Sequence, residues 1–278
     1  MLMDLSLLSK YRAQLMGFSI LIIVFYHFFN IGGTSNVDLF LRKVFSQGYV
    51  GVDFFMFASG LGLTFSLSKT ECLKDYYIKR WVRIFPFFTF ITLIECFIIR
   101  GESLGLSFLR STTIGYFVKG VPYIDWFIPA LVGLYIVYPI LYFKVIKQRY
   151  YKRAFFLMLF FVVLSCLASI FDILDWKHFA LLYRIPIFIL GAVTSSAIKY
   201  GYNPMLVRRV IVTYAVVGSI VAIVSKLLGG KNVIWLINAA FIPLYLYLLM
   251  NLFSYIHKKT ILRFWGGNLV FPSMVLLH

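Results

Sequence analysis

The fold is decided first by residues 13–31, which read AQLMGFSILIIVFYHFFNI. This stretch has the length and apolar character of a membrane-crossing helix, which needs roughly 20 predominantly apolar residues. Lys10 and Arg12 precede it, and no small-residue cleavage site follows near Asn30. We therefore expect a first membrane span that is kept in the mature protein, and not a cleavable signal peptide.

The rest of the chain repeats this pattern. Apolar residues make up 62% and charged residues 13% of its 278 residues, whereas soluble domains have roughly 45–50% and 25%. The composition excludes a water-soluble core and predicts an all-α transmembrane helix bundle. Nine candidate spans are visible: 13–31, 48–67, 81–99, 126–143, 154–172, 179–198, 209–228, 232–254 and 264–278.

The ninth candidate is too short to cross a membrane, so we expect either a natural chain that continues beyond it or a truncated product. There is no repeat of transporter type and no long linker, which predicts one membrane domain over residues 1–278. The longest segment between candidate spans, 100–125, is expected to form a short helix on the membrane surface.

The net charge is +17. In a membrane protein, basic loops are explained by topology and by anionic lipid headgroups, so a nucleic-acid partner is excluded. About two thirds of the Lys and Arg residues fall on one side when the N-terminus is cytoplasmic, as in a multi-pass protein of a bacterial-type inner membrane. Cys72, Cys96 and Cys166 have neither metal-ligand nor redox spacing, and we expect no metal site.

Four ionisable residues lie within the candidate spans, where such groups are expensive and usually functional: His27, Asp53, Glu95 and Arg184. His27 lies roughly 22 Å beyond Arg12 along the helix axis, in the outer half of the membrane. Asp53 and Arg184 lie at a similar depth in their own spans. We expect these three residues to share one layer.

A neutral imidazole can accept a proton from an attacking hydroxyl near neutral pH, and a carboxylate such as Asp53 can orient it. Arg184 would then hold a carbonyl or oxyanion. The alternatives are a His27 that is hydrogen-bonded to a neighbouring helix and an Arg184 that reaches the headgroups. Glu95 is expected to be an interfacial residue or an ion-pair partner.

Arg80 and Arg83 lie one helical turn apart at the start of the third candidate span, so they share a face. Two guanidinium groups that face together suit a phosphate. Retention of basic residues on the cytoplasmic side explains them equally well. Spacing alone leaves both interpretations open.

Three ordered segments resemble the integral-membrane acyltransferase family 3. They are YRAQLMG at 11–17 leading to Tyr26 and His27, GYVGVDFFMFASG at 48–60, and YIKRWVRIFP at 77–86. Weaker similarities follow at 126–130 (WFIPA) with Tyr135, at 184–191 (RIPIFILG) and at 265–267 (WGG). The likeness covers nearly the whole chain, and the ordered set is fairly specific although each motif alone is weak.

This resemblance implies an acyl-coenzyme A donor, usually acetyl-coenzyme A, and an acceptor hydroxyl on a surface polysaccharide or a lipid-linked glycan. His27 would be the general base or a transient acyl carrier, while Arg80 and Arg83 would hold the charged end of the donor. The family often has an arginine eleven positions before its histidine, where this chain has Met16. Arg12, one helical turn earlier on the same face, is the expected substitute.

Two other classes of function remain open at this point. A transporter or flippase also buries ionisable residues along a path, but it would move a substrate without consuming an acyl donor. The absence of paired interrupted helices in two matching halves argues mildly against it. An inactive family member that acts as a membrane scaffold would fail to bind the donor.

Overall fold

A computed structural model describes residues 5–30, 36–70, 72–94, 101, 103, 126–201 and 204–258. All regular secondary structure in these ranges is helical, as the sequence predicts. The helices are α1 (Ser6–Lys10), α2 (Arg12–Asn30), α3 (Asn36–Phe45), α4 (Val50–Leu67), α5 (Leu73–Leu93), α8 (Phe127–Leu141) with a π-helical extension (Tyr142–Ile146), α9 (Tyr151–Phe171), α10 (Trp176–Leu182), α11 (Ile185–Tyr200), α12 (Pro204–Leu227) and α13 (Val233–Lys258).

Seven described helical segments are long and apolar enough to cross a membrane, where the sequence predicted nine spans. They are Arg12–Phe29, Leu39–Leu67, Phe127–Ile146, Tyr151–Phe171, Trp176–Tyr200, Met205–Leu227 and Val233–Ile256. Each overlaps a predicted span. The predicted ninth span, 264–278, lies outside the described residues, as does the predicted surface segment, 100–125, apart from residues 101 and 103.

The remaining predicted span, 81–99, overlaps α5, but its described part does not qualify as a membrane-crossing helix. α5 begins at Leu73, eight residues before the predicted start, and its first half includes Lys74, Asp75, Lys79, Arg80 and Arg83. These charges explain the difference, since they lower the apolar content of the helix. Residues 95–99, including the candidate Glu95, lie outside the described part of the chain.

α4 and α11 form the centre of the bundle and pack against each other more extensively than any other described pair. Two glycines allow this close approach. A Cβ atom on Gly60 would collide with the carbonyl group of Phe188, and one on Gly191 would collide with that of Phe57. Small residues at a membrane helix crossing let the backbones meet in this way.

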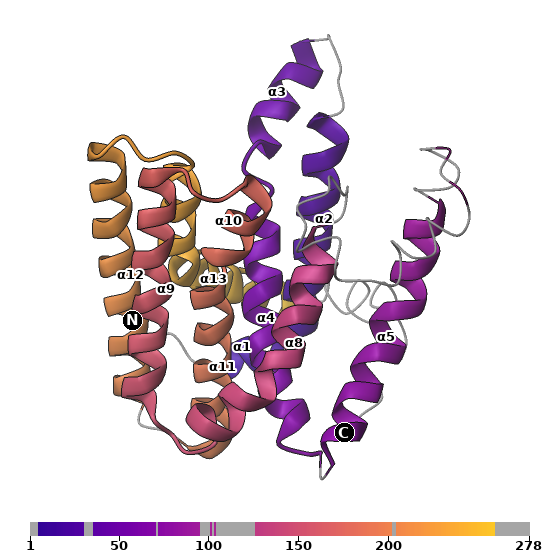
Figure 1. Cartoon of the computed structure of the whole chain (residues 1–278), viewed down its shortest axis with the longest axis vertical. Coiled ribbons are helices and arrows are strands. Elements are labelled where there is room, and N and C mark those ends of the chain that lie inside the picture. Colours follow the sequence, from indigo (N-terminus) through magenta and orange to yellow (C-terminus); the bar gives the residue numbers. More distant parts are fainter. Residues whose placement is uncertain are drawn as a thin grey trace.

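The other helices surround this central pair (Figure 1). α9 and α12 lie on one side, whereas α2 and α8 lie on the other. α13 packs against α12 and also contacts α2, where the ring centres of Phe253 and Phe18 lie 5.9 Å apart. α5 stands at the edge of the bundle, where α8 is its main described neighbour. α3 projects at the end of the bundle where α2 ends and α4 begins, and we call this end the α3 end.

Candidate functional site

Asp53 of α4 and Arg184, which precedes α11, form a buried ion pair near the α3 end. Arg184 Nε donates to Asp53 Oδ1 at 2.5 Å, and the two residues are 2% and 0% exposed for Arg184 and Asp53. Arg184 also donates from Nη1 to the Ala180 carbonyl at 2.9 Å and from Nη2 to the Tyr49 carbonyl at 3.4 Å. The guanidinium therefore has a partner at each of its three nitrogens.

Aromatic side chains enclose this pair. The Arg184 guanidinium carbon lies 5.1 Å from the centre of the Trp126 ring and 4.4 Å from that of Tyr183. The second carboxylate oxygen of Asp53 has no hydrogen bond of good geometry among the described residues, although the Tyr183 hydroxyl is close enough to interact with it. The positive charge of Arg184 and the negative charge of Asp53 therefore neutralise each other inside the protein, away from water.

A polar network joins α4 to α13 beside the ion pair. Asn238 Nδ2 donates to the Tyr49 hydroxyl at 2.6 Å and to Gln47 Oε1 at 2.9 Å. Tyr245 in turn donates to Asn238 Oδ1 at 3.3 Å. Asn238 is uncharged, so its residue type alone does not mark it as a functional candidate within a membrane span. It ties the start of α4 to α13 at the level of the ion pair.

His27 lies at the same end of the bundle but does not join the ion pair. Its side chain is exposed, and no hydrogen bond between it and Asp53 occurs among the described residues. The Tyr26 ring contacts both the His27 ring and the Tyr49 ring, with centres 5.1 and 6.1 Å away. In the structure Asp53 therefore pairs with Arg184, and the His27 side chain is exposed on the surface of the bundle.

The side of α2 that includes His27 also includes Arg12. The two residues are fifteen positions apart, which corresponds to about 60° around the helix axis and roughly 22 Å along it. α2 packs against α4 through Ser19 and Ile23, which meet Gly51. Arg12 and His27 therefore lie near opposite ends of the side of α2 that contacts α4.

Arg12, Arg80 and Arg83 gather at the other end of α2, and we call them the arginine cluster. Arg12 interacts electrostatically with both other arginines. Its guanidinium lies against Gly62 of α4, where a Cβ atom would collide with it. The structure therefore brings Arg80 and Arg83 of α5, the two predicted phosphate ligands, together with Arg12 of α2, the predicted substitute for the family arginine at Met16.

Hydroxyl and aromatic groups surround the cluster, but no described carboxylate pairs with it. The Arg80 guanidinium lies 5.6 Å from the Tyr76 ring centre and 5.9 Å from that of Tyr135. Tyr135 donates to Ser59 Oγ at 3.5 Å. Arg80 Nε is buried and has no hydrogen-bond partner among the described residues, so the cluster holds positive charge that the described protein does not neutralise.

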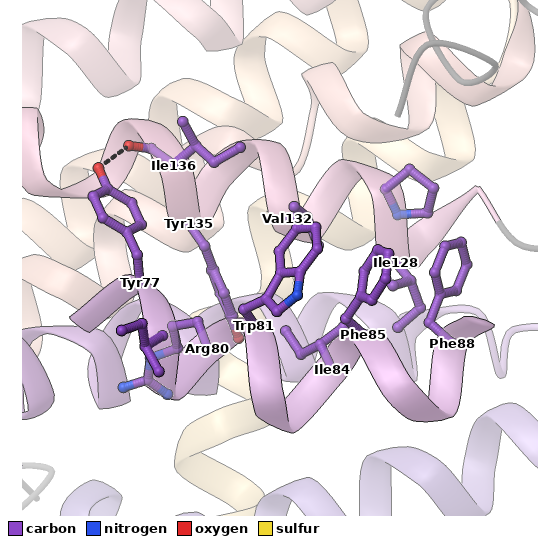
Figure 2. A pocket seen from close by; sticks show the side chains of 12 residues that line it. Tyr77, Arg80, Trp81, Ile84, Phe85, Phe88, Ile128, Val132, Tyr135 and Ile136 are labelled. Carbon is purple, nitrogen blue, oxygen red and sulfur yellow. Dashed lines mark hydrogen bonds between the residues drawn. The ribbon is translucent and has the colours of Figure 1, made fainter. Parts of the chain in front are cut away.

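A pocket of about 650 Å³ opens beside the cluster, between α5 and α8. Figure 2 shows Arg80 toward its Tyr77 end, followed along α5 by Trp81, Ile84, Phe85 and Phe88. Its opposite wall comes from α8 and includes Val132 and Ile128. The volume is within the usual range of ligand sites, about 300–1,000 Å³.

Sequence reasoning missed Tyr76, Ser59 and Asn238 as parts of these sites. Tyr135 and Ser59 fall in segments whose likeness to a family is visible, but nothing in the sequence shows that their hydroxyl groups meet. Tyr76 packs fully buried next to Arg80 from one helical turn earlier. These neighbours come from three helices, so they depend on packing and not on local pattern.

Seven apolar helices in the described part of the chain, a buried ion pair and a cation cluster without described counterions define a multi-pass membrane protein with a site suited to an anionic ligand. Residues 15–274 match the family model of the acyltransferase domain of family 3, and the chain belongs to this family. It is therefore a membrane acyltransferase. The match includes His27, Asp53, Arg80, Arg83 and Arg184, but it begins after Arg12. No curated protein and no solved structure matches the chain.

Proposed function

We propose that this acyltransferase transfers an acyl group, acetyl in the simplest case, from acyl-coenzyme A to a hydroxyl of a carbohydrate. The acceptor would be a surface polysaccharide or a lipid-linked glycan, and the protein would reside in a bacterial-type inner membrane with its N-terminus in the cytoplasm. One observation carries the proposal: an arginine cluster without described counterions lies on the same side of α2 as His27.

The donor is proposed to place its phosphates on the arginine cluster. Coenzyme A is rich in phosphate and is made in the cytoplasm, which agrees with the orientation expected from the distribution of basic residues. Guanidinium groups bind phosphate through short, charge-assisted hydrogen bonds. The long arm of the coenzyme would then extend along α2 toward His27, a distance of roughly 22 Å.

His27 is proposed to act as the general base. Its imidazole would accept the proton of the acceptor hydroxyl while that oxygen attacks the thioester carbonyl carbon. The new carbon–oxygen bond would form as the carbon–sulfur bond breaks, and the leaving thiolate would take the proton from the imidazolium. In the variant of this mechanism with an acyl-imidazole intermediate, the same ring would carry the acyl group between two such steps.

Asp53 and Arg184 are proposed to serve this reaction as a pair. Arg184 would bring positive charge near the oxyanion that develops on the thioester carbonyl. Its longest hydrogen bond, the 3.4 Å contact from Nη2 to the Tyr49 carbonyl, is the one that an oxyanion could replace. Asp53 would fix the guanidinium through Nε, and it would influence His27 only through the intervening Tyr49 and Tyr26.

The test is acyl transfer to a glycan by the purified protein in nanodiscs. A His27→Ala variant should lose roughly 10²–10⁴-fold in kcat, the usual contribution of a general base, while coenzyme A binding stays normal. His178→Ala, which removes a partly exposed histidine outside the proposed site, is the control and should remain active. Ordinary turnover by a well-folded His27→Ala variant would contradict the mechanism, and glycan flux without donor consumption would favour a flippase.

A further inference from the structure

The pocket between α5 and α8 has a polar end and a long apolar interior. Its polar end is Arg80, whose Nε has no described hydrogen-bond partner. The pocket extends from Tyr77 to Phe88 along α5, which corresponds to roughly 16 Å of helix. Such a shape suits an amphiphile with an anionic group at one end.

The interior walls offer almost no hydrogen-bonding groups to a ligand. The Tyr77 hydroxyl already donates to the Ile136 carbonyl at 3.0 Å, and Tyr135 donates to Ser59 Oγ at 3.5 Å. Apart from the Trp81 indole N–H, the two amide groups of a pantetheine arm would find few partners there, and burying an amide without a partner costs about 1–3 kcal/mol. A hydrocarbon chain has no such groups.

The pocket opens toward the outside of the bundle. Four of its lining residues, Tyr77, Ile78, Trp81 and Ile136, are between 39% and 54% exposed. In a membrane-spanning bundle an exposed apolar flank of this kind would face the bilayer, so a molecule already in the membrane could enter from the side. A water-soluble ligand would instead have to enter at the polar end, beside Arg80.

We propose that this pocket binds an anionic phospholipid of the surrounding membrane, with its phosphate on Arg80 and one hydrocarbon chain between α5 and α8. Lipid tails gain little from moving between the bilayer and an apolar pocket, because both surroundings are equally apolar. Headgroup charge therefore determines the preference, through charge-assisted hydrogen bonds to Arg80. The lipid site does not depend on the proposed function, but a donor that uses the same arginine would compete with the lipid.

Trp81 lines the pocket and reports on its occupant. Phospholipids with brominated chains quench tryptophan on contact, and the difference in fluorescence between the wild type and Trp81→Phe isolates this residue. In nanodiscs, brominated phosphatidylglycerol should quench Trp81 at a mole fraction roughly tenfold lower than brominated phosphatidylcholine does, given the strength of a hydrogen bond to a charged group. Arg80→Gln should abolish this preference, whereas Arg80→Lys should keep part of it.

Lys79→Gln is the matched control, because it removes one positive charge next to Arg80 without changing a pocket residue. This variant should keep the full preference for phosphatidylglycerol. Equal quenching by both lipids in the wild type would overturn the proposal, as would a preference that survives in Arg80→Gln. Release of the brominated lipid by dodecanoyl-coenzyme A but not by coenzyme A would instead assign the pocket to the acyl chain of the donor.

Discussion

Two groups of charged residues lie near opposite ends of α2 and differ in how their charge is balanced: the buried pair of Arg184 and Asp53, and the partly exposed arginine cluster. Near the α3 end, Arg184 is paired with Asp53 at 2.5 Å, and each of its nitrogens has a partner. At the other end, Arg12, Arg80 and Arg83 interact with one another without a described carboxylate partner. The first group can stabilise the fold by itself. The second places like charges together, and a bound anion would relieve their repulsion.

The largest expected loss of stability comes from breaking the ion pair between Asp53 and Arg184. Asp53→Ala would leave the Arg184 charge buried without a partner, and loss of one member of a buried ion pair destabilises a protein by about 3–5 kcal/mol. Thermal unfolding of the purified variant in detergent should show a strongly lowered Tm. The double variant Asp53→Leu with Arg184→Met should recover much of the loss, because it removes both charges. A Tm unchanged in Asp53→Ala would show that the pair does not hold α4 to α11.

Two glycines on α4, Gly60 and Gly62, allow a matched comparison between the packing of α4 on α11 and the contact of α4 with the arginine cluster. Gly60→Ala places a methyl group against the Phe188 backbone, which cannot move aside easily, and should destabilise the protein by about 1–3 kcal/mol. Gly62→Ala, half a turn away, meets only the mobile end of Arg12. It should leave the Tm nearly unchanged and weaken coenzyme A binding a few-fold. Equal losses of Tm in both variants would contradict this distinction.

The ion pair of Asp175 and His178 lies near the protein surface. Its loss is expected to change the stability of the protein less than loss of the buried pair of Asp53 and Arg184. Asp175 caps α10 by accepting a hydrogen bond from the His178 backbone at 2.9 Å. Burial alone would raise the pKa of Asp175, but hydrogen bonds from His178 and the nearby charges outweigh burial and lower it. Asp175→Ala should destabilise the protein by about 1 kcal/mol, as expected for the loss of a helix cap.

The lowered pKa of Asp175 also makes its contribution to the stability of the fold depend on pH. Because the folded pKa lies below the unfolded value of about 3.9, the stabilisation is fully present above that value and is lost as the pH falls through the folded pKa. A comparison of Tm between the wild type and Asp175→Ala at pH 6 and at pH 3 checks this. The gap should narrow at the lower pH, and a gap that widens would contradict the assignment.

The sequence predicted the helices better than their contacts. Apolar length alone located seven spans, because a membrane crossing imposes its length on local composition. The depth argument placed His27, Asp53 and Arg184 near one end, and Tyr26 and Tyr49 indeed connect them. It did not predict that Asp53 would pair with Arg184 instead of His27, since that depends on how each helix is rotated about its axis.

The arginine cluster likewise depends on contacts between helices that the sequence does not predict. Spacing put Arg80 and Arg83 on one face of α5, but only the packing of α2 beside Gly62 brings Arg12 to them. The apolar pocket had no sequence signal, because Trp81 and Phe85 would look the same on a lipid-facing helix. Its existence depends on the distance between α5 and α8.

The most direct test of the central claim is the affinity of coenzyme A for the arginine cluster. Isothermal titration into nanodiscs of uncharged phosphatidylcholine, which avoids competition from anionic lipid, should give saturable binding to the wild type. Arg80→Gln should raise Kd roughly tenfold or more, as expected for the loss of a charge-assisted hydrogen bond, with no loss of Tm, while Lys79→Gln should bind normally. An unchanged Kd in a folded Arg80→Gln variant would contradict the assignment of this cluster to the donor.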